Sequence, residues 1–188
     1  KANPDELTSD LAVKAANKAL QSAGLSINDI DCIVLATTTP DCTFPSTATI
    51  VQQKLGAINA FAFDVQAVCA GFVYALSVAN GLMCAGQGSN TLVIGAETFT
   101  KLLDWNDRST CVLFGDGAGA VVLQAENSEE GYGIIANTLH SDGRFKDILY
   151  VDGGVSSTGS IGHVKMQGRE VFKHAVEKLS SAMEKVLN

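Results

Sequence analysis

Cys69 is the residue of this sequence that is best placed to do chemistry. It lies between a run typical of a strand, residues 60–65, and a run typical of a helix, residues 70–86. A side chain at such a junction sits at a helix amino terminus, where the helix dipole and free N–H groups favour an anion. That environment favours the nucleophilic thiolate, and the same N–H groups can form an oxyanion hole. The alternative is a small buried core residue, which is the usual state of a free cysteine.

The glycine-rich stretch 115–119 resembles a dinucleotide-binding loop only in its composition. That motif requires a helix directly after the glycines. Residues 120–123 are Ala-Val-Val-Leu, which favours a strand instead. We therefore predict a tight turn that joins the two strands of a hairpin, residues 110–114 and 118–123.

The three histidines offer little to a catalytic base or to a metal ion. His140 ends a predicted strand, residues 133–139, and could act as a base for Cys69, but a solvated turn is the simpler interpretation. His163 and His174 fall in a loop and on a helix surface. No cluster of cysteine and histidine has the spacing of metal ligands, so we predict no metal site.

Arg108 is a candidate contact for an anionic ligand. It lies close to Trp105, and a guanidinium beside an aromatic ring suits a phosphate or an adenine. A surface ion pair with Asp104 or Asp107 is the simpler interpretation of the same residues.

A second basic feature follows near the end of the chain. Lys165, Arg169 and Lys173 recur every four residues, so they form a basic stripe if all three are helical. Such a stripe is usually a solvated helix face.

The elements around these residues alternate between strands and helices. The continuous apolar run 32–36 predicts a strand that is buried on both faces, and residues 60–65 and 91–95 predict two further strands. This order predicts an α/β fold with a mostly parallel sheet, to which the hairpin adds antiparallel strands. The third predicted helix is apolar on nearly every side, so we expect it to be buried all round. Helices are predicted at 8–24, 46–56, 70–86 and 168–188.

Composition excludes several classes of protein. The 188 residues are 46% hydrophobic and 18% charged, which indicates a folded domain. A net charge of −7 argues against nucleic-acid binding, and no apolar run reaches the roughly 18 residues of a membrane span. Five cysteines without Cys-x-x-Cys spacing indicate free thiols in a reducing compartment.

Four stretches together resemble β-ketoacyl-acyl carrier protein synthase III, a condensing enzyme of the thiolase superfamily. The most specific is the cysteine segment 64–76, which contains Ala-x-Cys-Ala-Gly-Phe-x-Tyr-Ala-Leu. The resemblance runs over essentially the whole chain, in matching order and spacing. The other stretches are 44–48, 107–108 with 114–119, and 166–172.

The resemblance implies a thiolase-like layered fold made of two similar halves. Residues 1–127 would form the amino-terminal half without its first strand, and residues 131–188 would begin the second half. The family uses a Cys-His-Asn triad, of which Cys69 matches the nucleophile. The histidine and asparagine are expected beyond Asn188, and none of the three histidines present stands in the family's setting. The chain is therefore expected to be part of a longer protein.

The resemblance also implies an activity, the initiating condensation of type II fatty-acid synthesis. Cys69 would take an acyl group, typically acetyl, from coenzyme A and then condense it with malonyl-acyl carrier protein. The family acts as a cytoplasmic homodimer without a cofactor, and neither nucleic acid nor membrane is an expected partner. Alternatives are another acyltransferase of the superfamily, of polyketide or hydroxymethylglutaryl type, or a non-catalytic dimerisation scaffold.

The remaining site residues are implied by the resemblance alone. Arg108 would contact the coenzyme A end of the substrate, and Phe44 would reach across a dimer interface. Lys173 and Arg169 would contribute to a basic face that docks the acidic carrier protein. The residues expected to line the pantetheine tunnel or the acyl pocket are Thr38, Leu113, Phe114, Met166, Gly168 and Phe172.

Overall fold

The computed structural model describes residues 1–126 and 132–187, which form two compact units. The first unit consists of Lys1–Thr98 with Asp116–Ile135, and the second of Phe99–Gly115 with Ala136–Asn188. The boundary predicted between residues 127 and 131 lies outside the described residues. The division of the chain into two similar halves stays a prediction.

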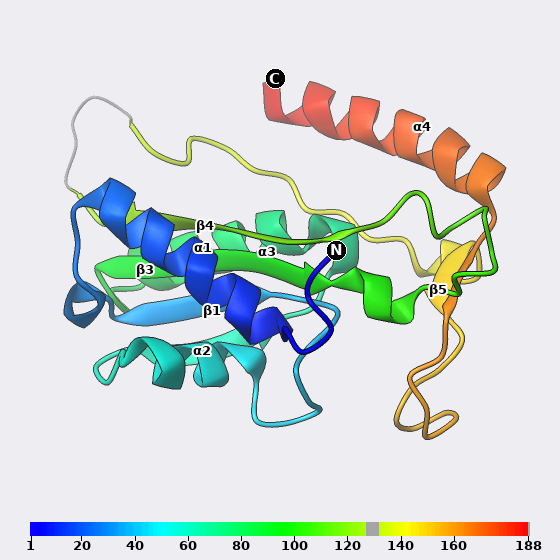
Figure 1. Cartoon of the computed structure of the whole chain (residues 1–188). Helices are drawn as coiled ribbons and strands as arrows, with labels where there is room; N and C mark the ends of the chain where they lie inside the picture. The colour runs from blue at the N-terminus through cyan, green and yellow to red at the C-terminus, as the bar shows by residue number, and fades with distance from the viewer. Residues whose placement is uncertain (127–131, 188) are drawn as a thin grey trace. The chain divides into compact units, whose positions relative to one another are not determined.

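The first unit is built on a four-stranded sheet in the order β2-β1-β3-β4 (Figure 1). The predicted parallel core is confirmed, because β1 pairs in parallel with both β2 and β3. β4 pairs antiparallel with β3 along its whole length and forms one edge. The strands are β1 (Cys32–Ala36), β2 (Phe61–Val65), β3 (Asn90–Thr98) and β4 (Asp116–Gln124).

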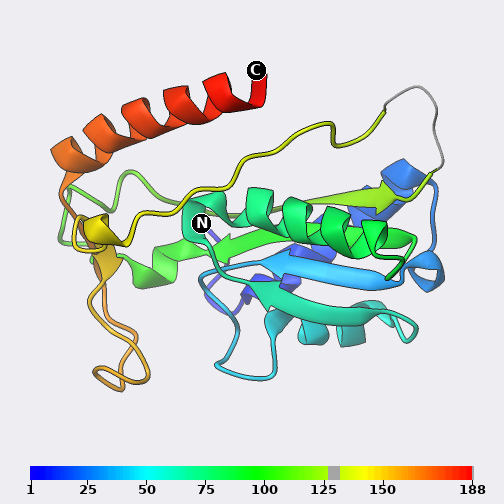
Figure 2. The same cartoon turned by 180° about the vertical axis from the view of Figure 1, so that it is seen from behind.

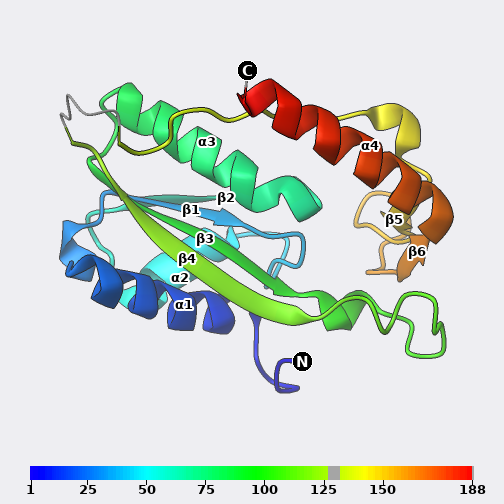
Figure 3. The same ribbon diagram turned by 90° about the horizontal axis from the view of Figure 1, so that it is seen from above.

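Three helices cover the two faces of this sheet (Figure 3). They are α1 (Thr8–Ala23), α2 (Thr47–Leu55) and α3 (Gly71–Cys84). Side chains alternate along β1, so Ile33 and Leu35 pack with α1 and α2, whereas Val34 and Ala36 pack with α3. β1 is buried along its whole length, as its continuous apolar run predicted.

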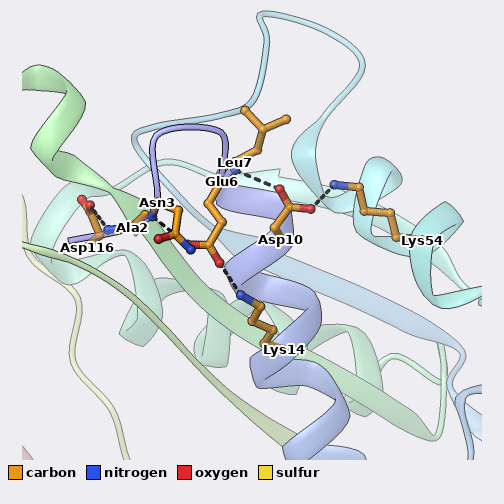
Figure 4. Close-up of polar contacts among 8 residues, drawn as sticks. All are labelled: Ala2, Asn3, Glu6, Leu7, Asp10, Lys14, Lys54 and Asp116. Atoms are coloured by element: carbon orange, nitrogen blue, oxygen red, sulfur yellow. Dashed lines mark hydrogen bonds and ion pairs between the residues drawn. The ribbon is translucent and has the colours of Figure 1, made fainter.

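The amino terminus of α1 is fixed by acidic side chains (Figure 4). Asp10 accepts a hydrogen bond from the backbone N–H of Leu7 at 2.9 Å and another from Lys54 of α2 at 2.7 Å. The backbone N–H of Ala2 donates to Asp116 of β4 at 2.7 Å. Leu7 is the N-cap residue, and Thr8, the first residue of the helix, is buried.

The second unit is smaller and contains one long helix, α4 (Gly168–Leu187). β5 (Leu149–Val151) and β6 (Val164–Met166) form an antiparallel pair that the sequence did not predict. Val164 packs in a small apolar cluster with Leu102 and Leu103. The described residues of the two units also form four short 3₁₀ turns: Ile27–Asp29, Val68–Ala70, Phe99–Leu102 and Gly143–Phe145.

The predicted hairpin at residues 110–123 is wrong. Residues 110–113 are turns, and β4 pairs with β3 rather than with them. Asp116 and Gly117, read as the tight turn, lie inside β4 opposite Thr98 and Glu97. The prediction fails because glycine is common in two settings. It occurs in tight turns, and it also occurs in strands that lie beside a cavity.

The strand predicted at residues 133–139 is also wrong. Described residues of this segment form no ladder with any described strand, and Ile135 is 86% exposed.

The expectation that the third helix is buried all round is wrong, and the helical condition for the basic stripe is not met. α3 buries only Gly71, Ala75 and Ala79, because the sheet covers one side of it (Figure 2). Lys165 belongs to β6, so no single helical stripe joins it to Arg169.

The described helices include none that is both long and apolar enough to cross a membrane.

Candidate active site

Cys69 lies at the turn that joins β2 to α3, as the sequence predicted. It is exposed and sits in the short 3₁₀ turn Val68–Ala70, directly before α3. Val68, the residue before it, has φ 48°, a conformation that costs free energy for a β-branched side chain. Strain of this kind persists only where the surrounding structure enforces it, so this turn is a constrained feature of the molecule.

The backbone donors at this turn limit where an oxyanion hole can form. The N–H of Ala70 donates to the carbonyl of Ala67 at 3.1 Å, and the N–H of Gly71 donates to the carbonyl of Val68. These two groups are therefore engaged within the turn. An oxyanion hole beside Cys69 must use other donors.

Cys69 faces a cavity of about 400 Å³ in the first unit. Small residues at the carboxyl ends of the parallel strands and at the start of β4 line most of it. This is the edge at which open α/β sheets bind their ligands. Lining residues include Ala36 of β1, Gly95 of β3 and Gly117 of β4, with Val68 and Phe72 beside the cysteine.

Two glycines let the elements around the cavity approach closely. A Cβ at Gly71 would lie 3.2 Å from the Cβ of Ala36, so glycine allows α3 to start this near β1 without a shift of either element. A Cβ at Gly95 would lie 3.2 Å from the Phe72 ring. Both distances are tighter than ordinary van der Waals contacts, so a larger residue at position 71 or 95 would push its neighbour aside.

Asp64 connects two of the sequence stretches that carry the resemblance. Its two carboxylate oxygens accept hydrogen bonds from the backbone N–H groups of Thr47 and Ala48, both at 2.7 Å. These are orphan donors of the first turn of α2, which Asp64 satisfies from β2. Burial raises the pKa of Asp64 above its ordinary value, and the two N–H donors oppose that rise. The loop before α2 is thereby tied to the strand that leads to Cys69.

Glu97 is the functional candidate that sequence reasoning missed. It is the only charged side chain among the described residues that line the Cys69 cavity. Its carboxylate accepts hydrogen bonds from the backbone N–H of Thr38 at 2.8 Å and from the hydroxyl of Thr39 at 2.6 Å. Burial raises the pKa of Glu97, and the hydrogen bonds from Thr39 and Thr38 oppose that rise. The available signal was a lone acidic residue at the carboxyl end of a buried strand.

Thr38 lies close to the cysteine segment. Its hydroxyl is 3.4 Å from the amide nitrogen of Gln66, three residues before Cys69. The structure therefore brings Thr38 together with the turn that carries the nucleophile. Phe44 lies on the loop before α2 and is 82% exposed, so its aromatic ring is available for contact with another chain.

The other predicted site residues belong to the second unit and are described within it. Phe114 packs in the apolar cluster of that unit, where its ring stacks on Phe99 at 4.7 Å between centroids. Leu113 is exposed, as is Phe172 of α4. Met166 ends β6, and its terminal methyl group would lie 3.5 Å from a Cβ at Gly168.

The basic candidates of the second unit are solvent-exposed. Arg108 forms no ion pair within the described part of the chain, so the surface ion pair considered from sequence is not observed. Asp107 instead accepts hydrogen bonds from Ser109 and Thr110. Arg169 and Lys173 are exposed on the first turns of α4.

All five cysteines are free thiols, as predicted from their number and spacing. Cys32 is fully buried, and burial raises its pKa to about 11. Residues 1–126 and 132–187 contain no group of three or more histidine, cysteine or acidic side chains that could hold a metal ion.

Known proteins match this chain along its length. The family model of 3-oxoacyl-[acyl-carrier-protein] synthase III matches residues 63–143, which include Cys69, Glu97 and Arg108. A curated β-ketoacyl-[acyl-carrier-protein] synthase III of Rhodobacter capsulatus is 62% identical over 185 residues. That match covers 97% of this chain and 57% of the relative, so the chain spans little more than half of the relative's length.

Solved structures give the same result for the fold. The 3-oxoacyl-[acyl-carrier-protein] synthase III of Aquifex aeolicus has a TM-score of 0.90 and 43% identity, covering 100% of this chain and 58% of that chain. The priming β-ketosynthase of the R1128 polyketide pathway has a TM-score of 0.84 and 32% identity, over 96% of this chain and 55% of its own. The chain is therefore similar along its length to proteins of the 3-oxoacyl-[acyl-carrier-protein] synthase III family, shares their thiolase-like fold, and spans little more than half of their length.

Proposed function

We propose that the protein containing this chain initiates type II fatty-acid synthesis by a two-stage condensation on Cys69. The observation that carries the proposal is the position of this exposed thiol, on a strained turn beside a cavity at the carboxyl end of the sheet. The names of the relatives supply the reaction class. We expect the histidine and asparagine of the family's triad in the part of the relatives' length that this chain does not span.

The first stage transfers an acyl group from coenzyme A to the enzyme. The Cys69 thiolate attacks the thioester carbonyl, a new carbon–sulfur bond forms, and the thiolate of coenzyme A leaves. The small side chains around the cavity leave space for the acyl group. Acetyl is the proposed donor group.

The second stage forms the carbon–carbon bond. Malonyl-acyl carrier protein loses carbon dioxide, and the electron pair of the broken bond becomes an enolate. The α-carbon of the enolate attacks the acyl-cysteine carbonyl, and the Cys69 thiolate leaves with the electrons of the carbon–sulfur bond. The product is a β-ketoacyl-acyl carrier protein, and the covalent intermediate divides one difficult reaction into two easier ones.

The other site residues receive proposed roles in binding. Arg108 would bind the coenzyme A end of the donor, since its exposed guanidinium is unpaired with any described carboxylate. Arg169 and Lys173 would attract the acidic carrier protein to the start of α4. Residues proposed to line the acyl pocket or the pantetheine tunnel are Thr38, Leu113, Phe114, Met166, Gly168 and Phe172.

We also propose that the protein acts as a homodimer in the cytoplasm. Phe44 is 82% exposed, and it would be covered by reaching toward the partner subunit's site. Five free thiols fit a reducing compartment.

The test is intact mass spectrometry of the full-length protein after brief incubation with acetyl-coenzyme A. We expect the mass of one acetyl group on the wild type and none on Cys69→Ser, because the hydroxyl lacks the acidity of a thiol. Both proteins should first be checked for folding and for oligomeric state. No gain of mass from any acyl-coenzyme A by a folded wild type would contradict the proposal and favour the scaffold alternative.

A panel of donors separates the proposal from its nearest alternative. The polyketide-priming relative, at 32% identity, makes another acyltransferase of the superfamily the second candidate. Loading by acetyl-coenzyme A in preference to longer or branched donors supports the initiating role in fatty-acid synthesis. Preference for a longer donor would keep Cys69 as the nucleophile, but it would favour another acyltransferase of the superfamily over the initiating enzyme.

A further inference from the structure

Glu97 belongs to a buried polar cluster at the carboxyl end of β1. β1 ends at Ala36, opposite Gly95, so residues 96–98 of β3 continue beside the segment Thr37–Thr39 rather than beside a strand. The Thr39 hydroxyl donates to Glu97 at 2.6 Å and accepts from the backbone N–H of Thr98 at 2.9 Å. These hydrogen bonds continue past Ala36, where the backbone ladder between β1 and β3 ends.

The cluster extends from the cavity to the opposite face of the sheet. On the cavity side, Glu97 lines the space beside Cys69. On the far side, Thr8 of α1 donates to the carbonyl of Thr39 at 2.6 Å and lies 2.9 Å from the Thr98 hydroxyl. Glu97 and Thr8 therefore both bind Thr39, but of these two residues only Glu97 reaches the cavity.

A second set of contacts runs from Glu97 toward the nucleophile. The Glu97 carboxylate accepts a hydrogen bond from the backbone N–H of Thr38 at 2.8 Å. The Thr38 hydroxyl in turn lies 3.4 Å from the amide nitrogen of Gln66. Gln66 precedes Val68, the residue with φ 48°. A strained residue keeps its conformation only when the surrounding structure enforces it. On the side of α3, the close approach of Gly71 to Ala36 supplies such a contact.

We propose that Glu97 is a positioning residue, which acts through Thr38 and Gln66 to hold the strained turn that aims Cys69 at its acyl donor. This inference rests on the proposed function and assigns a role to a side chain outside the family's Cys-His-Asn triad. Glu97 itself does not need to touch the donor. Its loss should change the rate of acyl transfer more than the binding of the donor.

The experiment measures two rates at Cys69 in the full-length protein. The first is single-turnover acylation at several concentrations of acetyl-coenzyme A, and the second is alkylation by iodoacetamide. Acyl transfer requires a defined angle of attack, whereas a small alkylating agent requires only an accessible thiolate. A relaxed turn should therefore slow the first reaction without slowing the second.

We expect Glu97→Ala to lower the maximal acylation rate about tenfold and to leave the half-saturating donor concentration within about twofold. Alkylation should be about threefold faster than in the wild type. Glu97→Gln should recover acylation to within about threefold of the wild type, because its amide oxygen can accept from Thr38 and its amide nitrogen can donate to Thr39.

Thr8→Val is the matched control. It removes hydrogen bonds from the same buried cluster on the side away from the cavity, at nearly constant volume. We expect it to lower the melting temperature and to leave both rates within about twofold of the wild type. If Thr8→Val changes both rates as Glu97→Ala does, the role of Glu97 is structural only and the proposal is overturned.

Gln66→Met tests the proposed route of action. It should lower acylation about threefold, and the double variant with Glu97→Ala should be no slower than Glu97→Ala alone, because both changes break one chain of contacts. Additive losses in the double variant would overturn that route.

If the wild type accepts no acyl group, the proposed function fails, and the alkylation rates alone then test the role of Glu97. Faster alkylation in Glu97→Ala than in Thr8→Val supports positioning, and equal rates contradict it.

Discussion

Cys32 and Cys69 are free thiols of the same unit in opposite environments. Cys32 begins β1 at the amino end of the sheet, is fully buried, and has its pKa raised to about 11. Cys69 follows the carboxyl end of β2 and is exposed beside a cavity. The comparison shows that burial separates two side chains of the same type, because only the thiol of Cys69 is accessible to a reagent.

The largest expected effect is a difference in alkylation between these two thiols. In the native full-length protein at pH 7.5, we expect iodoacetamide to modify Cys69 at least about a thousandfold faster than Cys32, because attack requires an accessible thiolate. Isotope-coded labelling with peptide mapping measures both rates. In urea the two rates should converge. Comparable native rates would show that the buried and exposed environments described above are wrong.

Asp64→Ala removes the link between the cysteine segment and α2. Two backbone donors lose their acceptor, so we expect the free energy of unfolding to fall by about 2–3 kcal/mol. Asp64→Asn keeps one acceptor oxygen and should lose about 1 kcal/mol. Urea titration measures both variants. Equal losses for the two variants would contradict the two-bond account of this carboxylate.

The buried thiol predicts a pH dependence of stability. Folding keeps Cys32 neutral, whereas the unfolded chain releases this proton near the ordinary pKa of 9.0. The stabilisation is fully present below pH 9 and is lost as pH rises through about 11, by about 3 kcal/mol in total. The measurement is the difference between wild type and Cys32→Ala in free energy of unfolding. A difference that does not change over this range would contradict the raised pKa.

The smallest expected effects concern the two glycines beside the cavity. Gly71→Ala places a methyl group against the Cβ of Ala36, which the backbone fixes, so we expect a loss of about 1–2 kcal/mol. Gly95→Ala meets the Phe72 ring, which can turn aside, and should lose about 0.5 kcal/mol. Thermal unfolding ranks the two variants. A larger loss at Gly95 would show that Phe72 is the more rigid neighbour.

Much of the first unit could be predicted from the sequence because its signals are local. The continuous apolar run gave β1 with its observed bounds, and Ser46 and Gly56 marked the ends of α2. Cys69 was placed at the turn before α3 by the same kind of reasoning. Each of these features depends on neighbours in the chain, which a single sequence displays.

The rest depended on pairings between distant residues. β4 was assigned to a hairpin because its glycines favour a turn, and only its register with β3 shows that they leave space beside Cys69. Glu97 was missed for the same reason, since its partners Thr38 and Thr39 lie almost 60 residues earlier. α3 was expected to be buried all round, although an apolar surface does not show what covers it.

The most direct test of this account is to locate the acyl group among the five cysteines of the full-length protein. The protein would be treated briefly with isotope-labelled acetyl-coenzyme A, digested at low pH and mapped by tandem mass spectrometry. We predict label on Cys69 and none on Cys32, Cys42, Cys84 or Cys111. Label on another cysteine, or an equal distribution among the exposed thiols, would contradict the central claim that the strained turn selects Cys69.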